Sequence, residues 1–196
     1  MTQDAAPKPP SPATPAPRFT FPPALDQWNL SMRAWLQAND KHYDGLHASA
    51  LVYDPRGRTL LLQRAAHDSM PNRWEPAGGA VDDEDETILH ACARELREEA
   101  GLVARRVVRV VPETGVGDVF TNRTGRRFYY RFVFEVEVED VGVVRTDPEE
   151  HSRWVWATED EVRAERTEDG TEMPFTAAIT KKVLLEGFEA RAGAGS

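Results

Sequence analysis

The 196-residue chain has little cysteine, no long hydrophobic run and no excess of positive charge. Its single cysteine, Cys92, excludes an intramolecular disulfide and favours a reducing compartment, so a cytoplasmic protein is expected. No run is apolar enough for a secretory signal or a membrane span, so neither is expected. The net charge of −9 is unfavourable for a protein that follows the phosphates of a nucleic-acid polymer, and no such partner is expected.

The distribution of proline predicts a tail, an arm and a domain. Eight of the 14 prolines lie in residues 1–23, among alanine, serine and threonine, which predicts a disordered or polyproline-like tail. Residues 24–44 are expected to form a short helical arm, in which Trp28 and Trp35 need an apolar partner. Docking on the domain is the first expectation for this arm, and contact in a homodimer is the alternative. The rest of the chain is long enough for one core.

The run from Arg94 to Leu102 carries the strongest functional pattern. Glu95, Glu98 and Glu99 stand at i, i+3 and i+4, the spacing that places side chains on one face of a helix. Carboxylates spaced in this way repel one another by about 0.2–0.5 kcal/mol per pair on an exposed helix. A hard divalent cation at their focus, Mg²⁺ or Mn²⁺, would explain the pattern. A solvated acidic face is the alternative.

The surrounding residues predict a helix over 86–100. Apolar side chains fall on the side away from Glu98, namely Leu89, Cys92, Ala93, Leu96 and Ala100. Gly101 is placed to end the helix in a left-handed conformation, and the acidic residues 82–85 supply N-cap candidates. Cys92 is therefore expected to be a small core residue rather than a nucleophile.

A glycine pair precedes this helix, where backbone can approach a ligand closely. Together, Gly79, Glu86 and the Arg94–Leu102 run resemble the Nudix box, G-x5-E-x7-R-E-U-x-E-E-x-G-U, in which U is a bulky aliphatic residue. Every fixed position from Glu86 onward agrees, but six residues rather than five separate Gly79 from Glu86. We interpret the extra residue as an insertion in the acidic turn ahead of the helix.

The resemblance implies a metal-dependent hydrolase of nucleoside diphosphate derivatives, in which water attacks one phosphorus. It also implies an α/β fold, the Nudix α/β/α sandwich with a mixed central β-sheet, over residues 45–190. Extended segments are expected at 47–53, 58–64, 107–111, 127–138 and 153–157, and helical segments at 159–163 and 175–188. A nucleotide-sensing Nudix-fold binding module without turnover is the alternative.

The resemblance further assigns roles to the box residues. Glu98 and Glu99 would hold Mg²⁺ or Mn²⁺, with Glu95 and the Gly79 carbonyl completing the set. Arg94 would keep the Glu98 carboxylate in place.

The general base has two candidates. Glu95 ranks first by resemblance, and Glu150 ranks second, because the Glu149–Glu150 pair precedes a strand that contains tryptophan. For that pair, simple surface acidity is the alternative.

Candidate substrate contacts lie on both sides of the box. The arginines that would reach phosphates are Arg64 and Arg73 before the box and Arg123, Arg126 and Arg127 around the Gly125 turn. The aromatic residues that would stack on a base are Phe120, Tyr129, Trp154 or Trp156. Exposed hairpin charges and core aromatics are the alternatives, and no pattern indicates which nucleotide is cleaved.

Overall fold

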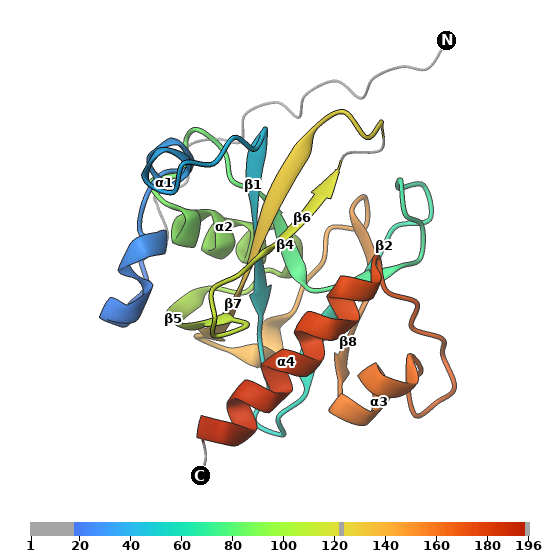
Figure 1. Cartoon of the computed structure of the whole chain (residues 1–196). Helices are drawn as coiled ribbons and strands as arrows, with labels where there is room; N and C mark the ends of the chain where they lie inside the picture. The colour runs from blue at the N-terminus through green and yellow to red at the C-terminus, as the bar shows by residue number, and fades with distance from the viewer. Residues whose placement is uncertain (1–17, 122–123, 195–196) are drawn as a thin grey trace.

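The computed structural model describes residues 18–121 and 124–194 and contains two β-sheets flanked by helices (Figure 1). The strands are β1 (Gly45–Leu51), β2 (Thr59–Arg64), β3 (Trp74–Glu75), β4 (Ala77–Ala80), β5 (Ala104–Val111), β6 (Asp118–Thr121), β7 (Phe128–Val138) and β8 (His151–Ala157). The α-helices are α1 (Met32–Ala38), α2 (Ile88–Ala100), α3 (Glu159–Ala164) and α4 (Ala178–Ala194), and two 3₁₀ helices are η1 (Pro23–Trp28) and η2 (Val141–Val143).

The larger sheet is mixed, as expected. Its strands follow the order β4–β1–β7–β5, with β6 also paired to β7, and only β1 and β7 are parallel. The smaller sheet, β3–β2–β8, is antiparallel. β1 and β2 therefore belong to different sheets, although they follow each other in the chain. In the turn between them the Asp54 carboxylate accepts hydrogen bonds from the amides of Arg56 and Arg58, both at 2.9 Å.

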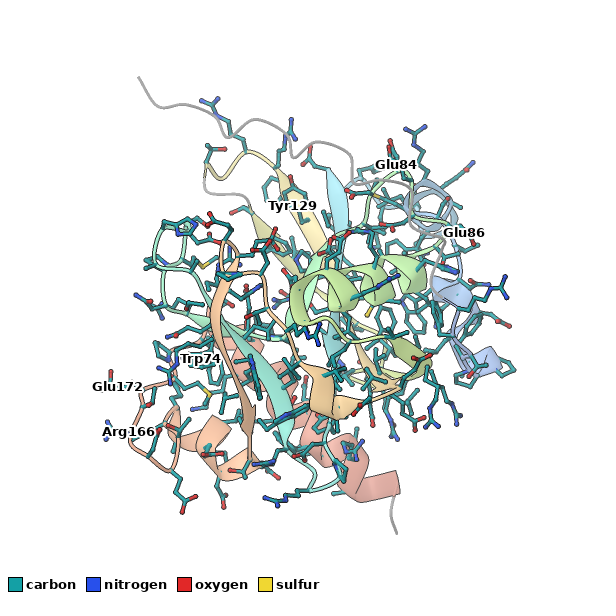
Figure 2. All side chains as sticks on the ribbon, turned by 180° about the vertical axis from the view of Figure 1, so that it is seen from behind. Trp74, Glu84, Glu86, Tyr129, Arg166 and Glu172 are labelled. Atoms are coloured by element: carbon teal, nitrogen blue, oxygen red, sulfur yellow. The ribbon has the colours of Figure 1, made fainter. Side chains whose placement is uncertain are left out.

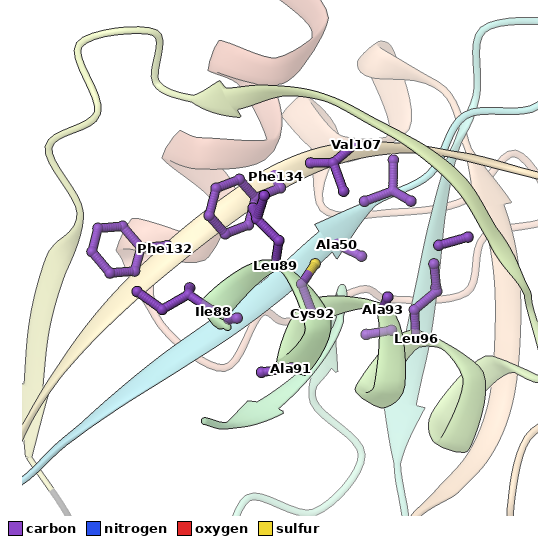
Figure 3. Close-up of a cluster of buried hydrophobic side chains, with 14 of the residues drawn as sticks. Ala50, Ile88, Leu89, Ala91, Cys92, Ala93, Leu96, Val107, Phe132 and Phe134 are labelled. Atoms are coloured by element: carbon purple, nitrogen blue, oxygen red, sulfur yellow. The ribbon is translucent and has the colours of Figure 1, made fainter. Parts of the chain in front are cut away.

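The apolar side of α2 faces the larger sheet. In this core, Ile88, Leu89, Cys92, Ala93 and Leu96 of the helix cluster with Ala50, Val107, Phe132 and Phe134 of the strands (Figure 3). The helix begins at Ile88 rather than at Glu86, and its N-cap is Thr87, whose hydroxyl accepts a hydrogen bond from the His90 amide, rather than one of the acidic residues 82–85. Gly101 ends it with φ of 68°, as predicted.

The N-terminal segment packs on the domain. Trp28 and Trp35 are buried in the same core as the apolar side of α2, with the Trp35 ring edge-on to Phe132 at 4.9 Å. The tail boundary expected at residue 23 is too late, because the Thr20 amide donates to the Arg105 carbonyl at 3.0 Å and the side chain of Phe21 packs against the core. The proline-rich composition of residues 1–23 as a whole predicted a tail, although the apolar residues at its end pack on the domain. Residues 1–17 of the expected tail lie outside the described residues.

Helix α4 lies on the face of the larger sheet opposite α2, and the two views agree on this (Figures 1 and 2). A second core joins Val183, Leu184 and Phe188 of α4 to Leu51, Leu61, Trp74 and Val133 of the strands. The helix begins at Ala178 rather than at residue 175, because Phe175 forms a β-bridge with Trp74. No helix in the described part of the chain is long and apolar enough to cross a membrane.

The chain changes sheets at Pro76, next to the polar side of α2. β3 pairs with β2 in the smaller sheet, and β4 pairs with β1 in the larger one. Because Pro76 has no amide hydrogen to contribute to a strand pair, it suits this crossing point. The crossing places Glu75 at the smaller sheet and brings Gly78 and Gly79 to the glutamates of α2.

Candidate active site

Arg94 connects the polar face of α2 to the strand and the loop before it. Its Nη1 donates to Glu95 Oε1 at 2.7 Å and to Glu98 Oε2 at 3.2 Å. Its Nη2 donates to the Ala80 carbonyl at 2.9 Å, and its Nε and Nη2 each reach an oxygen of Asp85 at 2.9 Å. The predicted contact with Glu98 is present, and the structure adds Glu95, Asp85 and Ala80 as partners.

The extra residue ahead of the helix is absorbed in a closed turn. The Asp82 amide donates to Asp85 Oδ2 at 2.9 Å, and the Asp85 amide donates to the Asp82 carbonyl at 3.2 Å. Because Asp85 also binds Arg94, the turn is fixed to the helix that follows. Glu86 is exposed at the outer end of this helix, with its carboxylate 3.6 Å from His90, and Glu84 lies on the loop before it (Figure 2).

The two glycines of β4 let the glutamates approach the strand closely. A Cβ on Gly79 would overlap the Glu95 carboxylate, so any larger residue would displace that group. The Gly78 amide donates to Glu99 Oε2 at 2.7 Å. Glu95 and Glu99 are thus held against the backbone of β4 rather than extended into solvent.

The strand register assigns the glycine carbonyls differently from the sequence expectation. Backbone groups of an antiparallel edge strand alternate between facing the partner strand and facing away. The Val81 amide bonds the Leu46 carbonyl of β1 at 2.9 Å, and the Gly78 amide instead faces Glu99. By this alternation Gly79 turns toward β1, and the carbonyl on the side of Glu99 is that of Gly78. The backbone on the side of Glu99 is therefore that of Gly78, while a metal contact from the Gly79 carbonyl stays a prediction.

Burial disfavours the charged forms of Glu95 and Glu99. Burial raises the pKa of Glu95 to about 7, against the lowering effect of the Arg94 guanidinium. Burial also raises the pKa of Glu99 well above its ordinary range, and the nearby Glu95, Glu75 and Glu150 carboxylates add to this rise. A divalent cation fits this donor set, because it would supply the positive charge that the ionised carboxylates lack.

Comparison with known proteins identifies this arrangement. Residues 44–178, from just before β1 to the start of α4, match the NUDIX domain. The chain belongs to the Nudix family. The matched segment contains both sheets, the glycine pair and the whole of α2, so the box pattern lies inside the domain that the match defines.

Solved Nudix structures share the fold. The Escherichia coli ORF135 protein in solution is 25% identical with a TM-score of 0.56, and the match covers 76% of this chain and 91% of that one. The MutT protein from Methanosarcina mazei Go1 is 22% identical with a TM-score of 0.55, covering 76% and 94%. An α/β Nudix fold with a mixed sheet between helices is thereby established.

A curated relative matches a shorter segment. The CTP pyrophosphohydrolase of Escherichia coli strain K12 is 44% identical over 55 residues, which are 28% of this chain. The matched segment spans 40% of the length of that relative.

A second polar cluster of the Nudix domain lies where the smaller sheet meets Glu99. Ligand atoms of Glu99, Glu150 and His151 lie within 4.8 Å of one another, so the structure brings Glu150 to the site as expected. Glu149 is exposed and lies 3.8 Å from His67 instead. Sequence reasoning missed His151, because a lone histidine that opens a strand carries no spacing pattern.

Arg64 joins this cluster through carboxylates. Its Nη1 pairs with Glu75, and its Nη2 donates to Asp68 at 2.7 Å. Burial alone would raise the pKa of Glu75, but the His151 ring and the Arg64 charge bring it below its ordinary value. Arg64 therefore holds Glu75 and Asp68 in position within this cluster. Its contact with a substrate phosphate stays a prediction and would need guanidinium N–H groups that face solvent.

An aromatic shelf, defined as Phe120 and Tyr129, lies on the β6–β7 hairpin. The two rings are stacked with centroids 5.4 Å apart, and Tyr129 lies at the start of β7 (Figure 2). The Arg131 guanidinium lies 6.0 Å from the Phe120 ring, and His47 of β1 meets that ring edge-on at 5.6 Å. Phe120 is thus part of a half-buried group, while Trp154 is exposed and Trp156 packs against the core.

The remaining arginines are spread over two regions. Arg73 lines an open pocket of about 650 Å³, with its Nη1 donating to the Phe175 carbonyl at 3.1 Å and Lys181 on the same wall. Arg126 and Arg127 are exposed at the hairpin turn, and Arg123 lies outside the described residues. The structure therefore does not gather the four predicted arginines that it describes around one phosphate site.

Proposed function

We propose that the protein hydrolyses a diphosphate linkage in a nucleoside diphosphate derivative, using Mg²⁺ or Mn²⁺ bound by the box glutamates. The observation that carries the proposal is the position of Glu95 and Glu99 against the glycines of β4, with Arg94 holding Glu95 and Glu98. Membership of the Nudix family supports the reaction class, and the match to a CTP pyrophosphohydrolase supports a nucleotide substrate.

The metal ligands proposed are Glu98, Glu99 and Glu95, with the carbonyl of Gly78 on the same side of the strand. When bound, the cation would polarise the phosphoryl group and lower the pKa of water beside it. Arg94 keeps Glu98 directed toward this centre while its bonds to Asp85 hold the helix start in place. The donor set fits a hard cation, because it consists of oxygen atoms.

Glu95 is the proposed general base. Burial raises its pKa to about 7 in the metal-free protein, and a cation bound beside it would lower this value, so the position of Glu95 rather than its pKa supports the role of base. It is held in position on two sides, by Arg94 and by the Gly79 backbone. Glu150 is the second candidate, since it is half-buried and lies near Glu99.

Base recognition is proposed for the aromatic shelf. Phe120 and Tyr129 offer apolar ring surface on a hairpin next to β1, and stacking on a nucleobase requires such a surface. The 55-residue likeness makes CTP the first substrate to assay.

The test is a hydrolysis screen of nucleoside triphosphates, nucleoside diphosphate sugars and dinucleoside polyphosphates with Mg²⁺ or Mn²⁺. Wild-type protein is compared with Glu98→Gln and Glu99→Gln, and the matched control is Glu172→Gln. Glu172 lies beside Arg166 at the periphery, away from α2 (Figure 2). We expect metal-dependent turnover that the two box variants lose and the control keeps. Tight nucleotide binding with no turnover of any compound would instead support the sensing module.

A further inference from the structure

His151 is a buried imidazole without a hydrogen-bond partner. Its side chain is 2% exposed, and neither Nδ1 nor Nε2 has a hydrogen-bond partner in the described part of the chain. A buried polar group without a partner costs about 1–3 kcal/mol, so such groups call for a specific explanation. A ring nitrogen of His151 lies within 4.8 Å of carboxylate oxygens of Glu99 and Glu150.

The backbone fixes His151 and Glu150 as a unit. The amides of both residues donate to the Asp147 carbonyl, at 3.0 Å for Glu150 and 2.7 Å for His151. The Glu150 carbonyl accepts from the Ala65 amide at 2.9 Å, which ties this turn to the end of β2. On the other side, Glu99 is held by the Gly78 amide. Three potential ligands, from α2, from the turn before β8 and from the first residue of β8, are thus held by backbone hydrogen bonds.

Glu75 is the other carboxylate near the imidazole, and it does not satisfy the ring. Its Oε1 lies 3.6 Å from His151 Nε2, which is longer than a hydrogen bond. The same oxygen pairs with Arg64 Nη1, so its charge is already compensated. The imidazole is therefore available to a further positively charged partner that Glu99 and Glu150 also face.

We propose that His151, Glu99 and Glu150 form a mixed nitrogen and oxygen site for a first-row transition cation, represented by Mn²⁺. One imidazole nitrogen and two carboxylates suit such a cation better than Mg²⁺, which prefers an all-oxygen shell. Glu99 belongs to this site and to the proposed hydrolytic centre, and the inference rests on the proposed function only through that residue. His151 would thus set the preference of the centre for Mn²⁺ over Mg²⁺.

The test is pulsed EPR of the full-length protein loaded with one equivalent of Mn²⁺, with the protein made once with natural and once with ¹⁵N-labelled histidine. We expect a ¹⁴N coupling that changes to a ¹⁵N coupling on labelling and disappears in His151→Gln. In calorimetric titrations, Mn²⁺ affinity should fall roughly tenfold or more in His151→Gln. Mg²⁺ affinity should change by less than about threefold, because oxygen ligands dominate its binding.

The control is His67→Gln, which removes an exposed imidazole 3.8 Å from Glu149 and should keep both the coupling and the Mn²⁺ affinity. If His151→Gln does not fold, the labelled wild-type protein decides alone. Absence of a histidine coupling there, or its persistence in folded His151→Gln, overturns the proposal. Hydrolysis that needs Glu98 without any histidine coupling would refute this site and leave the proposed function standing. A histidine coupling in a protein that hydrolyses none of the compounds would support this site and refute the proposed function.

Discussion

The carboxylate of Glu95 lies against the α-carbon of Gly79, with no space between them for a side chain. The contact joins a fixed glycine of the box pattern to a fixed glutamate sixteen positions later in the chain. Close packing therefore explains why glycine occupies this position, because the φ angle of Gly79 does not lie in the left-handed region that favours glycine.

Gly79→Ala should reduce hydrolysis strongly, by roughly tenfold to a hundredfold, because the new methyl group displaces Glu95 from its position. Steady-state kinetics with the best substrate of the screen checks this. Gly193→Ala is the control, because a Cβ there meets nothing within 4 Å. Equal kcat/KM values for Gly79→Ala and wild type would show that the contact has no functional role.

Arg94→Ala should lower the free energy of unfolding by about 3 kcal/mol, because it leaves the buried Asp85 carboxylate without its cation. Arg33→Ala is the contrasting variant, since Arg33 pairs with Asp83 on the surface at 2.8 Å and its side chain is 80% exposed. That exposed pair should contribute less than about 1 kcal/mol. Urea unfolding of both variants measures the two effects, and similar losses would contradict the role of Arg94 as a structural hub.

Glu95→Gln should stabilise the metal-free protein at alkaline pH. The folded protein raises the pKa of Glu95 from 4.5 to about 7, so protonated Glu95 favours folding below pH 4.5 and this contribution is lost as pH rises through about 7. Glutamine keeps the neutral form at every pH. In EDTA, the variant should gain about 1–3 kcal/mol over wild type at pH 8 and nothing near pH 4. A difference that does not vary with pH would contradict the raised pKa.

Cys92 should not react with thiol reagents in the native protein. Its side chain is 1% exposed among the apolar residues of α2, and burial raises the pKa of the thiol far above its ordinary value. Labelling with an aromatic disulfide should proceed only as fast as the protein unfolds, and denatured protein should release one equivalent of thiolate. Rapid labelling under native conditions would show that α2 separates from the sheet.

The sequence predicted the parts of the site that depend on local periodicity. Helix α2, its buried face and its end at Gly101 follow from spacing alone, as does the contact between Arg94 and Glu98, which are one turn apart. The N-cap predicted among the acidic residues 82–85 was wrong, because the Thr87 side chain caps the helix and the Asp85 carboxylate binds Arg94 instead.

Features that depend on long-range pairing were not predictable in this way. The register between β4 and β1 determines that the backbone of Gly78, rather than that of Gly79, faces Glu99. The approach of His151 to Glu99 depends on how β8 pairs with β2. Neither register can be predicted from the local sequence, because the paired strands lie far apart in the chain.

The most direct test of the central claim is hydrolysis in H₂¹⁸O, with mass spectrometry of the products from CTP or the fastest substrate of the screen. The account predicts one ¹⁸O atom on a phosphorus of the products, with turnover that requires Mg²⁺ or Mn²⁺ and falls at least about a thousandfold in Glu99→Gln. Products without ¹⁸O on phosphorus, or labelled products formed equally well in EDTA or by Glu99→Gln, would contradict it.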